Sequence, residues 1–255
     1  MGHSPSISII TVVYNAGKTL EKTIQSIINQ TYKNIELIII DGRSTDETIA
    51  IIKKYEAYVT FWQSEADQGI YDAMNKGLKF SGGDYVTFLN AGDYYCNNSV
   101  LSTLFSDNQG EDVIYGDIFV EDVTSTPPRY QQAVDFNLEN LLSHGTAVVC
   151  HQAFFIKRNL APDYNTSFRY KAELNWYFDI VEANKQLNYM HKDIAVVCYS
   201  LGGFGYINYR NNLYEWCKLI IKRYGILIFF KYKYPGIIFH KLNYRYQISK
   251  KNKLK

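Results

Sequence analysis

The chain has 255 residues, enough for one large α/β domain or two small ones with a substantial core. Its four cysteines have no paired spacing, which argues against a zinc site or a disulfide framework and favours a reducing compartment. The formal net charge is +2, but residues 1–209 hold 15 Lys and Arg against 24 Asp and Glu, whereas residues 210–255 hold 12 against Glu215 alone. The C-terminal tail is therefore an electrostatically separate, basic segment.

The sequence also lacks the apolar segments of membrane and secreted proteins. No apolar run approaches the ~18 residues that span a bilayer. A signal-peptide core is absent as well, because residues 7–14 already have the pattern of a strand. We therefore expect a cytoplasmic protein.

The first hundred residues alternate between strand and helix periodicities. Strands are predicted at residues 7–13, 37–40, 59–62 and 85–89, where short apolar runs are rich in β-branched and aromatic residues. The second helix should follow Asp46, with Ser44 and Thr45 as candidate N-terminal caps. The buried faces of the first and third helices should be Leu20, Ile24, Ile27 and Ile28, and Ile70, Met74 and Leu78. Strands separated by helices predict an α/β fold with a mostly parallel sheet.

A polar loop follows each of these strands. The loops are Tyr14-Asn15, residues 41–46, residues 65–69 and residues 90–93. The carboxyl ends of parallel strands meet at one edge, where open α/β sheets bind ligands. Each loop alone could be ordinary turn chemistry. Four loops at one edge predict a binding crevice.

Asp93 is the first candidate metal ligand. It ends a buried strand on a turn with the small residues Ala91 and Gly92, and Mg²⁺ usually takes only one or two protein carboxylates. The alternative is that Asp93 forms a turn or caps a helix that starts near Ser99.

Four segments together resemble the ordered signature of bacterial family 2 glycosyltransferases. They are Thr11–Asn15, Ile40–Asp46, Ser64–Gly77 and Phe88–Asp93. The resemblance covers residues 6–95 best, extends less closely over residues 144–203, and is absent from the tail. It implies a GT-A fold with a nucleotide-sugar-binding half at residues 1–95 and an acceptor-binding half at residues 96–209. The charge and apolar pattern of residues 210–255 predicts a separate helical, basic, amphipathic tail.

The resemblance also implies an activity and roles for residues. The enzyme would transfer a sugar from a nucleotide diphosphate donor, with UDP-hexose expected, and invert the anomeric configuration. Tyr14 would pack on the nucleobase, Asp41 would lie at the base or ribose, and Asp93 would hold Mn²⁺ or Mg²⁺. Such a cation suits this reaction because it stabilises the charge on the departing nucleoside diphosphate. The other donor-binding candidates are Thr11, Val13, Asn15, Asp67, Gly69, Asn75, Asn90, Ala91 and Gly92.

The chain departs from the family pattern in two loops. The family often has a second acid after Asp41 and an Asp-x-Asp motif at the metal loop, whereas this chain has Gly42 and, in the loop, Asn90 and Gly92. Asp93 is then the one carboxylate expected to bind the metal directly. The Asn90 carbonyl could still serve the metal through water.

Glu173 is the candidate general base for the acceptor hydroxyl. It lies near the start of a predicted helix and resembles the family's base position, which is usually Asp. The buried face of that helix should be Leu174, Tyr177, Phe178 and Val181. The alternative is a solvated Glu that complements the helix dipole.

Two further segments of the acceptor half resemble family features. His151 and Gln152 resemble an acceptor-side pair before a strand at residues 153–156, and another strand is expected at residues 147–149. The alternative for His151 is a hydrogen-bonded core residue. Residues 201–205 resemble a loop near the donor phosphates, although a flexible connector would also explain their glycines.

Other classes fit less well. A nucleotidyltransferase or dinucleotide-dependent oxidoreductase would need a glycine-rich phosphate loop that the first strand lacks. A non-catalytic sugar- or nucleotide-binding module remains an alternative, because the metal loop has few acids. We do not expect nucleic acid as a partner, because the body of the domain is acidic.

The tail predicts contact with a membrane surface. Short apolar clusters alternate there with lysines, arginines and tyrosines, a pattern typical of segments lying in an anionic headgroup region. The resemblance then suggests single additions to a polyprenyl-diphosphate-linked O-antigen or capsule intermediate at the inner face of a bacterial plasma membrane. The alternative is that the tail's apolar residues complete the domain core or a homo-oligomer interface.

Overall fold

The computed structural model describes residues 4–122, 125–184, 186–200 and 208–232. Its N-terminal half is built on β1 (Ile7–Val13), an apolar strand that is buried along its whole length. The neighbouring strands β2 (Ile35–Asp41) and β4 (Tyr85–Phe88) both run parallel to β1, and β3 (Phe61–Ser64) runs parallel to β2. The expected strands and the α/β class are therefore confirmed.

Three helices connect these strands. They are α1 (Leu20–Ile28), α2 (Thr48–Lys54) and α3 (Ile70–Phe80). The predicted caps of α2 are wrong, because Glu47 takes the N-cap position without a side-chain cap bond, and the Asp46 carboxylate before it accepts the N–H of Thr48 at 3.0 Å. Ser44 and Thr45 are instead bonded within the loops at the end of the sheet.

The C-terminal half adds antiparallel pairs and one parallel pair to the same sheet, in the strand order β3-β2-β1-β4-β8-β6-β9-β5, with β7 paired to β6. Its strands are β5 (Tyr94–Tyr95), β6 (Val113–Asp122), β7 (Ser125–Gln131), β8 (Phe154–Lys157) and β9 (Tyr189–Ser200). Its helices are α4 (Val100–Leu104), α5 (Leu138–His144) and α6 (Ala172–Ala183). Short 3₁₀ turns lie at η1 (Glu56–Tyr58), η2 (Gly145–Ala147), η3 (His151–Ala153) and η4 (Arg158–Leu160).

The strand expected at residues 147–149 is wrong. Gly145, with φ of 64°, follows α5 and starts the 3₁₀ turn η2, so the apolar residues Val148 and Val149 are buried without joining the sheet. Buried residues in a turn give the same apolar sequence pattern as a buried strand. The chain turns here because Gly145 adopts a positive φ, which glycine tolerates. The next expected strand is confirmed as β8.

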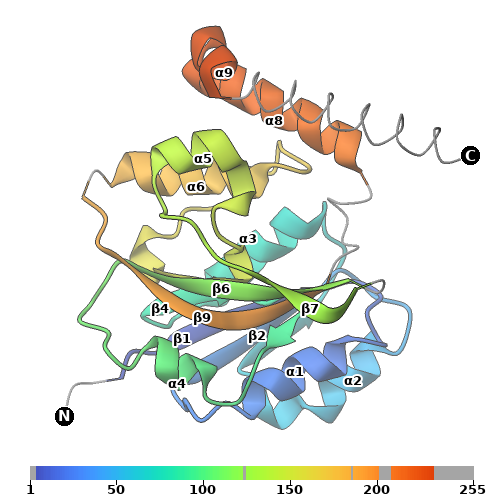
Figure 1. The fold of residues 1–255 in the computed structure, drawn as a ribbon. Helices are drawn as coiled ribbons and strands as arrows, with labels where there is room; N and C mark the ends of the chain where they lie inside the picture. Colours follow the sequence, from blue (N-terminus) through green and yellow to red (C-terminus); the bar gives the residue numbers. More distant parts are fainter. Residues whose placement is uncertain (1–3, 123–124, 185, 201–207, 233–255) are drawn as a thin grey trace, which may run out of the picture.

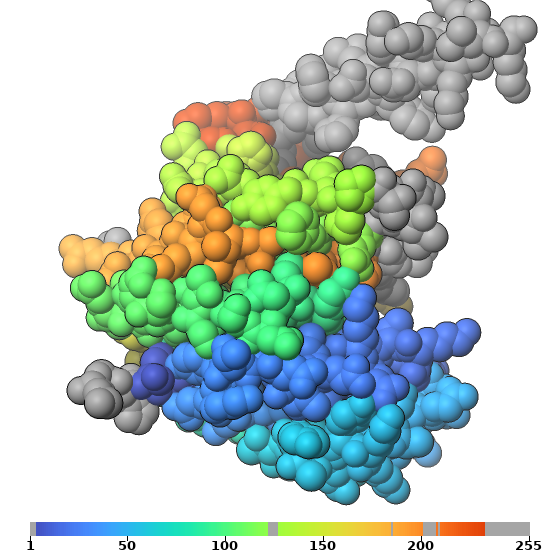
Figure 2. Space-filling view, turned by 60° about the horizontal axis from the view of Figure 1, so that its bottom comes forward, coloured from blue at the N-terminus to red at the C-terminus, as the bar shows by residue number. Residues whose placement is uncertain are grey.

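Helices cover both faces of the sheet (Figure 1). One face carries α1, α2 and α4, and the other carries α3, α5 and α6. On the second face, α6 buries Leu174, Trp176 and Tyr177 in the larger apolar cluster. In the view of Figure 2 the N-terminal residues, blue to cyan, form one side of the molecule, and the green and orange C-terminal half lies against them.

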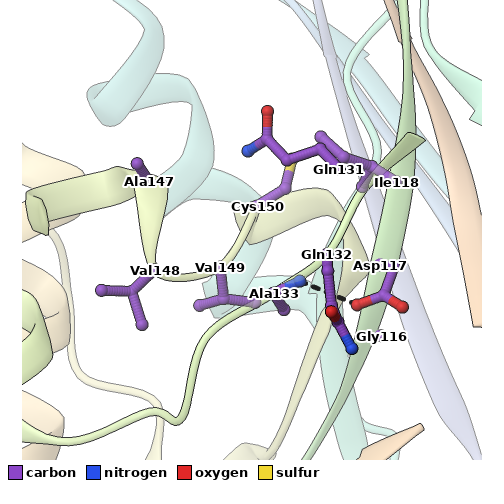
Figure 3. A pocket seen from close by; sticks show the side chains of 10 residues that line it. All are labelled: Gly116, Asp117, Ile118, Gln131, Gln132, Ala133, Ala147, Val148, Val149 and Cys150. Atoms are coloured by element: carbon purple, nitrogen blue, oxygen red, sulfur yellow. Dashed lines mark hydrogen bonds between the residues drawn. The ribbon is translucent and has the colours of Figure 1, made fainter. Parts of the chain in front are cut away.

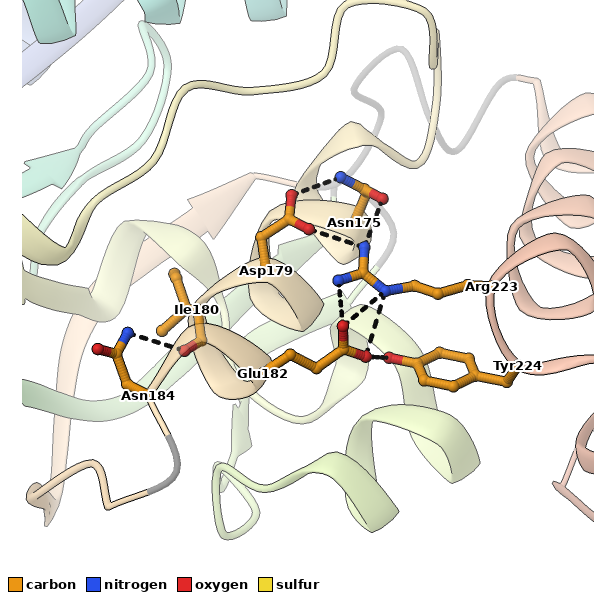
Figure 4. A network of polar contacts seen from close by, with 7 residues as sticks. All are labelled: Asn175, Asp179, Ile180, Glu182, Asn184, Arg223 and Tyr224. Carbon is orange, nitrogen blue, oxygen red and sulfur yellow. Dashed lines mark hydrogen bonds and ion pairs between the residues drawn. The ribbon is translucent and has the colours of Figure 1, made fainter.

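The basic tail begins with two helices, α8 (Tyr209–Tyr224) and α9 (Ile226–Tyr232). Leu219 and Ile220 of α8 are buried in the same apolar cluster as α6. The Arg223 guanidinium also contacts carboxylates of α6 (Figure 4). For α8, these contacts favour the alternative that the tail completes the core. Across the described ranges, no helix combines the length and apolarity that a bilayer crossing requires.

Candidate active site

The strand register brings the predicted donor-side loops together. Val13 pairs with Asp41, and Asp41 pairs with Ser64, so β1, β2 and β3 end in one row. The metal loop after β4 joins this row, because the N–H of Ala91 donates to the carbonyl of Val12. The predicted convergence of four loops at one sheet edge is therefore present.

Asp41 organises two of these loops. Its carboxylate is fully buried and accepts hydrogen bonds from the Ser44 N–H at 2.9 Å and from the Ser64 hydroxyl at 2.6 Å. The Ser44 hydroxyl also donates to Asp41 and accepts the N–H of Asn15. The amide oxygen of Asn15 accepts the N–H of Thr45 at 2.9 Å. These bonds fix the shape of the crevice, and contact of Asp41 or Asn15 with a donor stays a prediction.

Asp67 occupies the space beside Gly42. A Cβ atom on Gly42 would lie 2.5 Å from Asp67 Oδ2 and 3.4 Å from the Tyr14 ring. The Tyr14 side chain is 66% exposed and open to a ligand. A carboxylate from the third loop thus lies where a side chain at position 42 would lie, the position at which the resembling family often has its second acid.

The remaining donor-side candidates are mostly engaged within the protein. Thr11 and Val13 are buried in β1, and Gly69, with φ of 121°, leads into α3. The Asn75 amide donates to the Tyr164 carbonyl at 2.9 Å and accepts the Tyr164 N–H at 2.7 Å. Asn75 therefore ties α3 to the segment before α6, and its proposed contact with a donor stays untested.

The metal loop is held from α1. The Thr23 hydroxyl donates to the Asp93 carbonyl at 2.8 Å and accepts the N–H of Gly92 at 3.0 Å. Asp93 is 6% exposed, and its carboxylate accepts the Gln152 amide at 2.6 Å and the Ser200 N–H at 2.7 Å. Burial raises the pKa of Asp93 despite these two hydrogen bonds. Asp93 does not cap the helix near Ser99. The N–H and the hydroxyl of Ser99 donate instead to the side-chain oxygen of Asn97.

Hard-oxygen atoms beside Asp93 fit a divalent cation. Within the described part of the chain, Asn90 Oδ1 and Gln152 Oε1 are buried without a hydrogen-bond partner. Gln152 contacts the Asp93 carboxylate through its amide nitrogen. Buried polar atoms normally have partners. Mg²⁺ and Mn²⁺ bind oxygen ligands of this kind, here two amide oxygens without a hydrogen-bond partner and one carboxylate.

A second acidic group lies on β6 and β9. One ligand atom each from Asp117, His191 and Asp193 lies within 4.8 Å of the others. Asp117 is buried, however, and accepts the N–H of Ala133 at 2.8 Å, a contact drawn in Figure 3, as well as the Tyr130 hydroxyl. These bonds fasten β7 and the following segment to β6. They give Asp117 a structural role without a metal.

Glu173 of α6 and His151 of η3, both predicted on the acceptor side, lie beside each other. Nδ1 of His151 lies 3.3 Å from the Glu173 carboxylate, and its Nε2 lies 3.3 Å from the Asn90 amide nitrogen. The Glu173 and His151 side chains are 18% and 14% exposed, so Glu173 is not the solvated helix-start residue of the alternative. Burial alone would lower the pKa of His151, but the carboxylates of Glu173 and Asp93 outweigh it and raise that pKa.

Glu173 and His151 line a cleft of about 230 Å³. Its other walls come mainly from β6, β7, η2 and β9, with Arg129, Gln131, Thr146 and Tyr199 among the lining residues. The cleft shares Ile118, Gln131, Ala147 and Cys150 with the smaller pocket of Figure 3. These wall residues were not predicted, because no local sequence pattern predicts the strand pairing that brings them near Glu173.

The comparison with protein families decides the class. The profile described as "Glycosyl transferase family 2" matches residues 8–169. The chain belongs to this family. It is 33% identical over 204 residues to a PGL/p-HBAD biosynthesis glycosyltransferase of Mycobacterium tuberculosis, covering 75% of this chain and 76% of that protein. It is also 43% identical over 103 residues to an uncharacterized glycosyltransferase of Haemophilus influenzae, covering 39% and 41%.

Solved structures share the fold of this glycosyltransferase at low identity. S. aureus TarS 1-349 in complex with UDP-GlcNAc has a TM-score of 0.62 and 17% identity over 89% of this chain and 67% of that one. The mannosyltransferase PcManGT from Pyrobaculum calidifontis, in complex with GDP-Man and Mn²⁺, has a TM-score of 0.63 and 16% identity over the same shares. The chain spans only 39% of a longer TarS chain. The expected GT-A fold and family are confirmed.

The geometry of this glycosyltransferase gives each side a distinct chemical capacity. The predicted donor side has an exposed aromatic ring at Tyr14, a carboxylate at Asp67, and the buried oxygens of Asp93, Asn90 and Gln152. The predicted acceptor side has the carboxylate of Glu173, which lies 3.3 Å from the His151 ring. His151 lies between the two through its contact with Asn90. The loop predicted at residues 201–205 lies outside the described residues.

Proposed function

We propose that this glycosyltransferase moves one sugar per encounter from a nucleotide diphosphate donor to a saccharide hydroxyl, with inversion. Glu173 accepts the proton of that hydroxyl as its oxygen attacks the anomeric carbon. The observation that carries the proposal is the placement of Glu173 and His151 in one cleft, connected through Asn90 to the Asp93 loop. An inverting displacement needs a positioned base on the acceptor side, within reach of the attacking hydroxyl.

The donor lies at the row of strand ends in this proposal. Tyr14 packs on the nucleobase, and Asp67 with the Asp41 loop contacts the nucleoside. UDP-hexose is the first donor to test and GDP-mannose the second, because TarS and PcManGT hold UDP-GlcNAc and GDP-Man on the same fold. Asp93, with Asn90 and Gln152, would hold Mn²⁺ or Mg²⁺. A cation held there would stabilise the negative charge of the departing nucleoside diphosphate.

The acceptor is, in our proposal, a polyprenyl-diphosphate-linked O-antigen or capsule intermediate at the inner face of the plasma membrane. Support comes from α9, whose Ile226 and Leu227 are exposed, Leu227 by 81%, next to Lys231. The sequence beyond it, residues 233–255, contains seven Lys and Arg and no acid. Each basic residue near an anionic leaflet contributes about 1 kcal/mol to binding.

A donor panel tests the proposed reaction. Purified full-length protein would be incubated with UDP- and GDP-sugars, Mn²⁺ or Mg²⁺, and saccharide acceptors on a short lipid diphosphate. Release of nucleoside diphosphate and the anomeric configuration of the product would be measured, with Glu173→Gln as the matched inactive control. We expect an inverted product from the wild type only. Donor binding without turnover under every condition would instead indicate a non-catalytic binding module.

A further inference from the structure

Two separate anchors fasten α8 to α6. The first lies just before α6, where the Glu215 carboxylate accepts three consecutive backbone N–H groups: Arg169 at 2.9 Å, Tyr170 at 2.6 Å and Lys171 at 2.7 Å. The second lies further along α6, where Arg223 contacts Asp179 at 2.7 Å, Glu182 at 2.6 Å and the amide of Asn175 at 3.0 Å (Figure 4). The first anchor binds the backbone that leads into Glu173, whereas the second contacts α6 through side chains from Asn175 onward.

The first anchor has the geometry of an anion site. Successive backbone N–H groups in a turn form a concavity that binds a negative charge, and Glu215 fills this one from another helix. The same segment opens α6, because the Lys171 carbonyl accepts the N–H of Asn175 at 3.0 Å. Glu173 lies within this first turn. The position of its carboxylate therefore depends on the backbone that Glu215 holds.

The neighbour of Glu215 strengthens this arrangement. The Trp216 ring lies 4.8 Å from the Lys171 ammonium, and Lys171 is buried. The same ring packs so closely on Gly145 that a Cβ atom there would lie 2.4 Å from it. Gly145 begins η2, which carries Thr146 into the cleft. Glu215 and Trp216 thus contact the segment before Glu173 and the turn that forms the opposite wall.

We propose that Glu215 is a positioning residue for sugar transfer: it holds residues 169–171, and through them the Glu173 carboxylate, in register with His151 and the cleft. The inference rests on the proposed function of Glu173 as the base. It gives the first helix of the basic tail a role in the reaction that is independent of any membrane. A displacement of about 1 Å at a reacting group can cost 10²-fold in rate, and loss of three hydrogen bonds permits such a displacement.

A matched pair of variants tests the proposal. Glu215→Ala removes the anchor at the start of α6, and Arg223→Ala removes the anchor further along the same pair of helices. Both should lower the melting temperature. We expect Glu215→Ala to lower kcat at least tenfold with donor affinity unchanged, because the donor contacts lie on other loops, whereas Arg223→Ala should keep kcat within about twofold. Equal losses of kcat, or an unchanged kcat in Glu215→Ala, would overturn the proposal.

Amide hydrogen exchange gives a readout that does not need turnover. In full-length Glu215→Ala, the amides of residues 169–173 should exchange faster than in the wild type, and in Arg223→Ala they should exchange at the wild-type rate. Equal exchange in Glu215→Ala and wild type would refute the anchor. If the wild type transfers no sugar, the proposed function fails, and the exchange result still decides the anchor. If Glu215→Ala does not fold, Glu215→Gln, which keeps the shape but loses the charge, replaces it in both measurements with the same expected direction.

Discussion

The carboxylate of Asp67 beside Gly42 leads to a charge-exchange experiment. The chain lacks the second acid that its family often places after Asp41, but Asp67 Oδ2 lies 2.5 Å from where a Cβ atom of residue 42 would be. If Asp67 supplies this charge to the donor site, then Gly42→Asp should not improve the site. It would instead place two carboxylates in a space that holds one.

The structure allows the size of this effect to be worked out. Two unit charges about 4 Å apart repel by about 4 kcal/mol at an effective dielectric constant of about 20. Asp67 is partly exposed, so screening should leave about 1–2 kcal/mol. One carboxylate must then move or bind a proton, and donor affinity should fall about tenfold, since 1.4 kcal/mol is a factor of ten. The Cβ atom alone also displaces Asp67, so Gly42→Ala is the steric control.

The assay is a double-mutant cycle on donor affinity. Dissociation constants for UDP and GDP, with Mn²⁺ present, would be measured by calorimetry for Gly42→Asp, Asp67→Ala and the combined variant, with the steric control alongside. We expect both single variants to bind weakly and the combined variant to bind more tightly than either. Additive losses in the combined variant would refute the view that one carboxylate position is shared by the two loops.

Variants at the metal loop, the candidate base, the tail and α6 test other parts of the molecule. Asp93→Ala should lower turnover by several orders of magnitude while circular dichroism shows an intact fold, because the loss is of charge stabilisation in the transition state; full activity of this variant, or of the wild type in excess chelator, would exclude the metal. Glu173→Gln should keep donor affinity and lose roughly 10²–10⁴ in transfer rate; a collapse of donor binding in titrations would make Glu173 a donor ligand or a structural residue. Deleting residues 233–255 removes seven cations but leaves α8 and α9, so the fold should stay stable while salt-sensitive sedimentation with anionic vesicles weakens; unchanged vesicle binding would mean that these residues do not contribute to contact with the membrane. Burial alone would raise the pKa of Glu182, but the hydrogen bonds from Arg223 and Tyr224 lower it below its ordinary 4.5. The stabilisation from these bonds is therefore present above pH 4.5 and is lost as the pH falls through the lowered value. In thermal melts, the Glu182→Gln variant should lose less stability on acidification than the wild type, and equal losses would contradict this.

Local sequence patterns predicted the N-terminal half of the fold because its elements are locally determined. β1 and β4 are apolar runs bounded by turn residues, and α1 and α3 carry their apolar residues at helical spacing. Parallel order then follows from the alternation of strands and helices. The pattern failed at residues 147–149, where burial in a turn gives the same apolar letters as burial in a strand.

The walls of the cleft beside Glu173 could not be predicted in this way. β6 and β7 pair with each other and with β8 and β9, so the positions of Arg129 and Tyr199 in the cleft depend on contacts far apart in sequence. The tail shows the same limit. Its composition indicated a separate basic segment, whereas Leu219 and Ile220 of α8 join the core and Glu215 binds the segment before α6.

The departure of the metal loop from the family pattern has a physical reason in the contacts of His151. Its two ring nitrogens lie 3.3 Å from the Glu173 carboxylate and 3.3 Å from the Asn90 amide. An Asn side chain can donate through its amide nitrogen to a neutral ring or, rotated, accept through its oxygen from a protonated one. A carboxylate at position 90 could only accept, and it would compete with Glu173 for the charge of His151. When Asn90 donates to His151, its side-chain oxygen is left without a hydrogen-bond partner, as in this structure. With Asn at position 90, the side-chain oxygen stays available to a cation. The other ring nitrogen of His151 stays available to orient Glu173.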